Sequence, residues 1–197
     1  FDADGDGDVD LYVVSGGSEF IAGAPLYQDR LYVNNGTGVF TKTHEAIPAE
    51  TTSGSSVAAA DYDKDGDIDL FIGGRHAPAN YGVTPRSFLL QNQSKDNTVK
   101  FADVTNQVNT ELANAGMVTS AIWTDFNNDS WLDLIIVGEW MPVRIFENID
   151  GKLIERKDFA VHEKSNGSWC TVFPADIDDD GDMDYFLGNA GANLQFK

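Results

Sequence analysis

Acidic side chains recur at a fixed spacing in four nine-residue segments of the sequence. Each segment follows the pattern D-x-[DN]-x-D-G-x-x-D, with serine in place of glycine in the third copy. Positions one, three, five and nine carry carboxylate or amide oxygens, and position seven can add a backbone carbonyl. The residues at these five positions are Asp2, Asp4, Asp6, Asp8 and Asp10; Asp61, Asp63, Asp65, Asp67 and Asp69; Asp125, Asn127, Asp129, Trp131 and Asp133; and Asp176, Asp178, Asp180, Asp182 and Asp184.

This alternation of oxygen ligands is typical of a calcium site. Two like charges about 4 Å apart repel by roughly 1 kcal/mol even in water, so such a segment favours a counter-ion. Oxygen ligands without histidine or cysteine favour Ca²⁺ over zinc or copper. An EF-hand loop would close with glutamate at position twelve between helices, whereas here aspartate closes at nine between strands. The sequence therefore predicts up to four Ca²⁺ sites, with Ser130 least suited to its bend; empty, solvated turns are the alternative.

Other chemically active residues are few. The histidines, at positions 44, 76 and 162, are far apart, and no nucleophile-elbow, phosphate-loop or dinucleotide motif occurs. Cys170 lies beside Trp169 in an apolar run, which favours packing in the core, and a single cysteine excludes an internal disulfide. These observations favour a protein that is not an enzyme.

The charge balance excludes some classes of partner. The chain has 32 acidic and 13 basic residues and a formal net charge of −19. It therefore repels phosphate, which excludes nucleic acid and disfavours anionic membrane surfaces. Hydrophobic residues make up 42%, too many for a disordered acidic tail. No apolar run reaches the roughly 18 residues of a membrane-spanning helix.

Strand-like runs flank the acidic segments and must position them. A short apolar run follows each segment, and another precedes the second, third and fourth. None of these runs has a 3.6-residue period, so they are predicted as strands. Hairpins follow at 31–34 with 39–42 across Asn35-Gly36, 87–91 with 99–102, and 143–146 with 153–155 across Asp150-Gly151.

The acidic segments begin at residues 2, 61, 125 and 176, which indicates a repeat architecture. Four antiparallel strands in about 50–60 residues is the size of one propeller blade. The predicted fold is all-β: a β-propeller of four-stranded antiparallel blades, with an acidic loop between the first and second strands of each blade. We expect a single domain with repeats at about 1–50, 51–110, 111–163 and 164–197. Because the chain starts inside an acidic segment, we expect it to be about three to four blades of a larger propeller.

Residues 61–74 and 176–188 resemble FG-GAP or VCBS-type repeats, which build the β-propeller of integrin α subunits and of many bacterial surface proteins. The stretches 73–87 and 138–142 are similar to the cartilage acidic protein (ASPIC/UnbV) group. The resemblance implies Ca²⁺ held by positions one, three, five and nine and the position-seven carbonyl. It also implies a seven-bladed propeller and a secreted, cell-surface, outer-membrane or periplasmic location.

The predicted strand order separates two faces. Acidic loops between first and second strands share one face, and the long connections at 15–29, 73–86 and 138–142 lie on the other. Aromatic and arginine side chains there suit protein interfaces and sugar stacking. The alternative is that the arginines pair within their own blade and that the tryptophan packs on its neighbour. The partner-binding candidates are Tyr27, Arg75, His76, Tyr81, Arg86, Glu139 and Trp140.

The sequence thus predicts a calcium-stabilised extracellular or cell-surface module that binds a protein or glycan partner, as part of a larger protein or surface complex. A propeller-type polysaccharide lyase or hydrolase is the alternative, with Arg75, His76 and Glu139 as its candidate centre. A rigid structural spacer in a surface assembly is the third interpretation.

Overall fold

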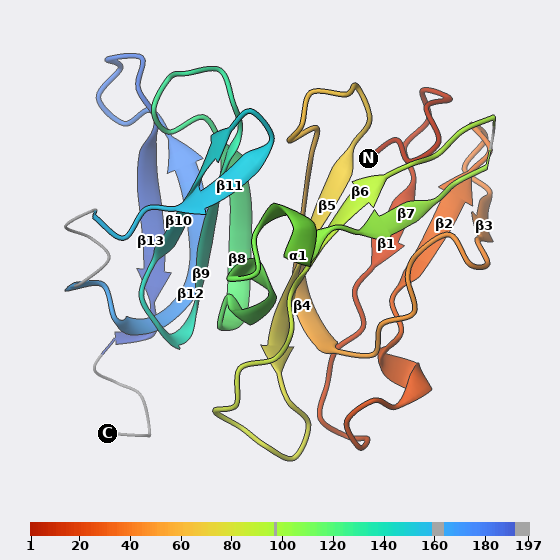
Figure 1. Ribbon diagram of the computed structural model, residues 1–197, viewed down its shortest axis with the longest axis horizontal. Helices are drawn as coiled ribbons and strands as arrows, with labels where there is room; N and C mark the ends of the chain where they lie inside the picture. Colours follow the sequence, from red (N-terminus) through yellow and green to blue (C-terminus); the bar gives the residue numbers. More distant parts are fainter. Residues whose placement is uncertain (97, 159–163, 192–197) are drawn as a thin grey trace.

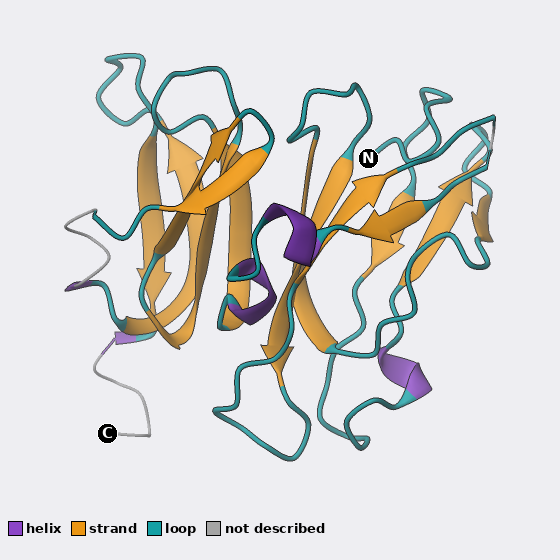
Figure 2. Cartoon of the chain, in the orientation of Figure 1, coloured by secondary structure: helices purple, strands orange, loops and turns teal. Residues whose placement is uncertain are grey.

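The computed structural model describes residues 1–96, 98–158 and 164–191, and antiparallel β-strands dominate these ranges (Figures 1 and 2). Short helical turns include η1 (Pro25–Tyr27), α1 (Thr105–Val108) and η2 (Leu112–Asn114). The strands are β1 (Leu11–Val13), β2 (Arg30–Asn34), β3 (Phe40–Lys42), β4 (Ser53–Ala60), β5 (Asp69–His76), β6 (Phe88–Asn92), β7 (Phe101–Asp103), β8 (Met117–Thr124), β9 (Asp133–Met141), β10 (Arg144–Ile149), β11 (Lys152–Glu155), β12 (Gly167–Ala175) and β13 (Asp184–Asn189).

Strands that follow one another in the sequence pair with one another. β1 to β3 form one sheet, β4 to β7 form a second, and β8 to β11 follow the same order in a third. β12 and β13 pair as a hairpin, and β12 also meets the end of β9, where Gly167 lies opposite Met141. The all-β antiparallel prediction is confirmed. The expected repeat boundary at 163 and residues 192–197 of the fourth repeat lie outside the described residues.

Apolar side chains pack between neighbouring sheets. Leu31 of β2 and Leu70 of β5 belong to one buried cluster. Phe71 of β5, Leu134 of β9 and Phe146 of β10 belong to another. Successive residues of β5 therefore face two different neighbours, and both faces of this strand are buried. This explains its continuous apolar run, which a strand with one solvated face would not have.

Cys170 is exposed, so the prediction that it packs in the core was wrong. The register of β12 against β13 shifts between Trp169 and Thr171, which makes Cys170 an extra residue in the strand. Val172 beyond it is buried again. An apolar run in the sequence does not reveal such a bulge, because the bulge breaks the alternation of inward and outward side chains.

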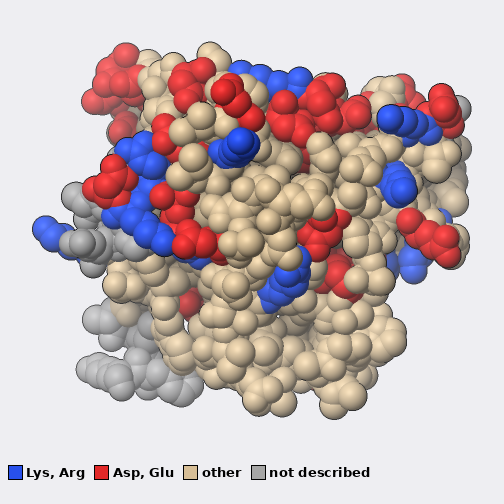
Figure 3. All heavy atoms as spheres, viewed as in Figure 1, with Lys and Arg blue, Asp and Glu red and all other residues tan. Residues whose placement is uncertain are grey.

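The strand order places two kinds of loop at opposite ends of the sheets. The acidic loops lie at the top of Figure 1, and the connections 14–29 and 77–87 lie at the bottom. We call the lower end, together with the β9–β10 connection, the long-loop face. In Figure 3 acidic side chains gather toward the upper edge, and the lower margin is largely uncharged.

Candidate metal sites and the long-loop face

The acidic loops share a set of hydrogen bonds to their own backbone. The position-one carboxylate accepts from residues further along the loop, as Asp61 does from the N–H groups of Asp65 and Gly66, each at 3.1 Å. The position-five carboxylate accepts from position seven, as Asp65 does from Asp67 at 3.0 Å. Corresponding bonds occur in the other three loops. They fold nine residues into a compact turn.

Two positions of each loop have a left-handed backbone. Position six does, with φ of 97° at Gly66 and 73° at Ser130. Glycine adopts this conformation freely and serine does not, so Ser130 is strained. Position four is also left-handed, for example at Lys64 with φ of 59°. The motif predicted the bend at position six but gave no sign of the one at position four.

The position-nine aspartates of the second and third loops attach each loop to the third strand of its own sheet. Asp69 is fully buried, and its Oδ1 accepts the N–H of Asn92 at 2.8 Å. Asp133 is equally buried and accepts from Asn148 at 2.7 Å and Phe126 at 3.1 Å. Burial raises the pKa of Asp69 to about 7 and that of Asp133 to about 6. A carboxyl group this buried favours its charged form when a cation lies beside it.

The second loop leaves carboxylate oxygens without a partner. Asp63 Oδ1 and Asp69 Oδ2 are buried and accept no hydrogen bond. One oxygen from each of Asp61, Asp63 and Asp69 lies within 4.8 Å of the other two. Three converging carboxylates, two of which also carry an unpaired buried oxygen, fit a hard cation such as Ca²⁺.

The first and fourth loops hold similar groups. Their converging carboxylates come from Asp2, Asp4 and Asp6 and from Asp176, Asp178 and Asp184. In the fourth loop, Asp176 Oδ1 is buried without a hydrogen bond. In the first, both oxygens of Asp10 accept backbone N–H groups, those of Ala3 and Asn34. Position nine therefore joins the converging group in the fourth loop and anchors the backbone in the first.

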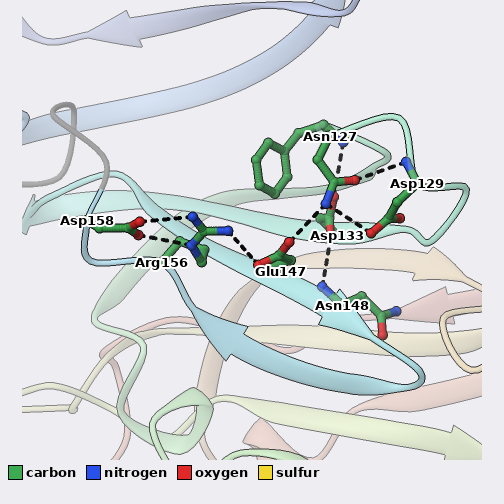
Figure 4. Close-up of polar contacts among 8 residues, drawn as sticks. Asn127, Asp129, Asp133, Glu147, Asn148, Arg156 and Asp158 are labelled. Carbon is green, nitrogen blue, oxygen red and sulfur yellow. Dashed lines mark hydrogen bonds and ion pairs between the residues drawn. The ribbon is translucent and has the colours of Figure 1, made fainter.

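The third loop is closed by side chains of its own sheet (Figure 4). Asn127 donates from Nδ2 to Asp129 and to Glu147 of β10, each at 3.0 Å. Glu147 pairs with Arg156 at 2.6 Å, and Arg156 also pairs with Asp158 at 2.9 Å. Within the described part of the chain, three carboxylates do not converge in this loop as they do in the second. An ion pair therefore lies beside this loop and is joined to it through the hydrogen bond between Asn127 and Glu147.

Asparagines that the sequence analysis did not single out connect neighbouring loops. Asn34, Asn92 and Asn148 occupy the same place in successive hairpins, and each backbone N–H donates to a position-nine aspartate. The side chain of Asn148 also donates to the Tyr62 carbonyl of the preceding acidic loop at 2.7 Å, as Asn92 does to Ala3 at 3.1 Å. Their recurrence with nearly the period of the acidic segments was the available signal.

On the long-loop face, five of the seven predicted partner residues lie together. Arg75 pairs with Glu139 of the next sheet at 2.6 Å, and the Tyr81 hydroxyl donates to the other Glu139 oxygen at 2.6 Å. The Trp140 ring meets Tyr81 edge-on, with centroids 5.0 Å apart. His76 lines a cavity together with Arg75, Tyr81 and Glu139. The candidate enzyme centre therefore clusters, but both oxygens of its carboxylate are engaged.

The structure places the other two candidates elsewhere. Tyr27 is only 2% exposed, and its hydroxyl exchanges hydrogen bonds with the backbone of Phe20. Arg86 pairs with Asp103 of its own sheet at 2.8 Å and lies over the ring of Phe88. Both side chains anchor their own connections. The alternative of pairing within one blade holds for Arg86 but not for Arg75, which pairs with the next sheet.

Comparison with known proteins gives the family. Within the described residues, none of the helices has the length and apolar character needed to cross a membrane. No curated protein matches the sequence. The similarity of residues 73–87 and 138–142 to the cartilage acidic protein group stays a prediction. The model of the FG-GAP-like repeat matches residues 2–72 and 125–187, which is more than half of the chain and includes all four acidic loops. The chain therefore belongs to the FG-GAP-like repeat family.

Proposed function

We propose that this chain is a calcium-stabilised β-propeller module that binds a partner outside the cell or at its surface. The observation that carries the proposal is the second acidic loop, where the carboxylates of Asp61, Asp63 and Asp69 converge, and Asp63 and Asp69 each hold an unpaired buried oxygen. Family membership supports it, because FG-GAP repeats commonly bind Ca²⁺ and typically occur in extracellular or surface proteins.

The first, second and fourth loops are the proposed calcium sites. Bound Ca²⁺ would neutralise their converging carboxylates and add oxygen coordination to the hydrogen bonds that already shape each turn. Extracellular calcium modules have dissociation constants of about 10⁻⁴–10⁻³ M, which suits the millimolar calcium outside cells. The third loop is proposed to depend less on metal, because Arg156 reaches it through Glu147.

The partner is proposed to bind the long-loop face. This end lies away from the acidic loops (Figure 1), and it exposes the aromatic rings of Tyr81 and Trp140. Exposed aromatic residues beside paired charges are typical of binding surfaces. They favour a binding module over a passive spacer.

A thermal melt in millimolar calcium and in excess chelator, with a count of metal per chain, tests the calcium part of this proposal. Calcium at a few times its dissociation constant stabilises the folded state by about 1 kcal/mol per site. We therefore expect a clear chelator-induced fall in melting temperature and three ions per chain. Asp65→Ala should reduce both, and Asp96→Asn, at an exposed acid outside the loops, should change neither. No melting shift and no bound metal would overturn the calcium assignment.

A further inference from the structure

A cavity on the long-loop face lies where three repeats meet. Its volume is about 560 Å³, which is within the range of small-molecule sites. Ser18 comes from the first repeat, Arg75, His76 and Tyr81 from the second, and Glu139 from the third. The cavity is therefore a feature of the packed repeats rather than of one loop.

The charged groups of this cavity neutralise each other. Arg75 Nη2 donates to Glu139 Oε1 at 2.6 Å, and the Tyr81 hydroxyl donates to Oε2 at 2.6 Å. The hydrogen bond from Arg75 holds the pKa of Glu139 below its usual value. The pair is thus a fixed arrangement of donors and acceptors without net charge, beside the imidazole of His76.

Tyr81 lines the cavity, and Trp140 packs against Tyr81 beside it in a strained backbone conformation. Trp140 has φ of 55°, in the left-handed region that bulky residues rarely adopt, yet its side chain is 57% exposed. The ring of Tyr81, itself 60% exposed, supports the indole edge-on. A Cβ at Gly82 would lie 3.3 Å from Trp140 Cζ3, so glycine leaves room for the indole. Backbone strain that presents an apolar ring to solvent points to a role in binding.

We propose that this cavity binds a neutral saccharide; the proposal rests on the binding-module function above and specifies its partner. The C–H face of a pyranose ring stacks on the electron-rich face of an aromatic ring such as Trp140. Sugar hydroxyls, which both donate and accept, match the paired Arg75 and Glu139. An anionic sugar is disfavoured, because Arg75 is already paired and the chain carries a net charge of −19. A protein partner would cover about 800 Å² per side and would therefore extend well beyond the residues of this cavity.

The test titrates the calcium-loaded chain with neutral oligosaccharides of glucose, galactose, mannose and xylose, followed by tryptophan fluorescence and calorimetry. We expect saturable binding of at least one of them. Trp140→Ala should weaken it at least tenfold, and Glu139→Gln should weaken it severalfold. Phe20→Ala, at an exposed aromatic residue outside the cavity, should leave it unchanged. Tyr81→Phe keeps the aromatic contact and should have a smaller effect than Trp140→Ala.

Several results would overturn the saccharide site. One is that no neutral sugar binds. Another is that a neutral sugar binds equally well to the Trp140→Ala variant. The third is that only uronate or sulfated sugars, or only peptides, bind. A chelator-dependent melt without sugar binding would sink this inference and leave the calcium assignment standing. Sugar binding without any calcium response would overturn the calcium assignment and leave the saccharide site standing.

Discussion

The second and third acidic loops share one motif but satisfy their carboxylates differently. In the second loop, Gln91 of β6 donates to Asp63 at 2.7 Å, and the other Asp63 oxygen stays unpaired. In the third loop, the corresponding strand residue is the carboxylate Glu147, which accepts from Asn127 at 3.0 Å. In the second loop the carboxylate lies in the loop and the amide on the strand, whereas in the third loop the amide lies in the loop and the carboxylate on the strand.

On the proposed calcium assignment, this exchange changes how each loop balances its charge. The carboxylates of the second loop converge and include unpaired oxygens, and a cation from solution can neutralise them. In the third loop, part of the charge lies on β10, where Arg156 reaches Glu147 at 2.6 Å. An acidic motif therefore does not by itself specify a metal site. On the proposed calcium assignment, the neighbouring residue of the third strand distinguishes a loop whose carboxylates converge from a loop that lies beside an ion pair.

The largest effect is expected when the position-nine carboxylate is removed. Asp69→Ala and Asp133→Ala each leave a buried N–H, of Asn92 or Asn148, without its acceptor. We expect each to lower the free energy of unfolding by about 2–4 kcal/mol. Only Asp69→Ala should also reduce the calcium dependence of unfolding, which urea melts in calcium and in chelator would measure. An equal loss of calcium dependence in both variants would remove the distinction between the loops.

Asp29 and Glu50 are a further pair of buried carboxyl groups, and their charge is balanced in a different way. Burial raises the pKa of Asp29 to about 6, and burial together with the nearby charge of Asp29 raises that of Glu50 to about 7. Ser15 donates its N–H to Asp29 at 2.6 Å, and Thr52 donates to Glu50 at 3.0 Å. Here a bound proton can take the place of a counter-ion, so this region should respond to pH rather than to calcium.

Glu50→Gln tests that contrast and should have the second largest effect. The pKa of Glu50 is about 7 in the folded chain, against a reference value of 4.5, so the folded state binds more protons. The stability this contributes is complete below the unfolded pKa and is lost as the pH rises through the folded pKa. A permanently neutral glutamine avoids the loss. We expect a gain of about 1–3 kcal/mol at pH 8 and much less at pH 5.

Urea unfolding at the two pH values, at constant saturating calcium, measures the effect of Glu50→Gln. The exposed neighbour Glu45 provides the control variant Glu45→Gln, which should shift stability little at either pH. Stabilisation by Glu50→Gln that does not change with pH would contradict the role of the proton.

Features that depend on neighbouring residues in the sequence were predictable. The Asp150-Gly151 pair predicted a hairpin, and both residues have the positive φ that a tight turn requires, 51° and 79°. The alternating aspartates predicted the acidic loops, which join β4 to β5, β8 to β9 and β12 to β13. These signals are strong because the backbone conformation and the side chains that need it lie within a few residues.

Features that depend on contacts between distant segments were not predictable. The ion pair beside the third loop is formed by Glu147 and Arg156, which follow its motif by many residues. Tyr27 was expected at a partner surface, but its own connection folds back and buries its hydroxyl against Phe20. Cys170 turns outward because β12 contains a bulge. A pattern within one segment does not contain the register or the packing that decides these outcomes.

The smallest effect on stability, and the sharpest test of the two-loop comparison, is expected from Arg156→Gln. The ion pair with Glu147 is partly exposed, and such pairs contribute little to stability. Its loss, however, leaves Glu147 beside the third loop without its cation, so we expect the calcium bound per chain to rise above that of the unmodified protein. Metal analysis at fixed millimolar calcium measures this change. Arg86→Gln, which breaks a similarly exposed pair with Asp103 away from the acidic loops, should leave the count unaltered. If Arg156→Gln also leaves it unaltered, the guanidinium does not substitute for a metal, and the difference between the loops lies in Asn127 alone.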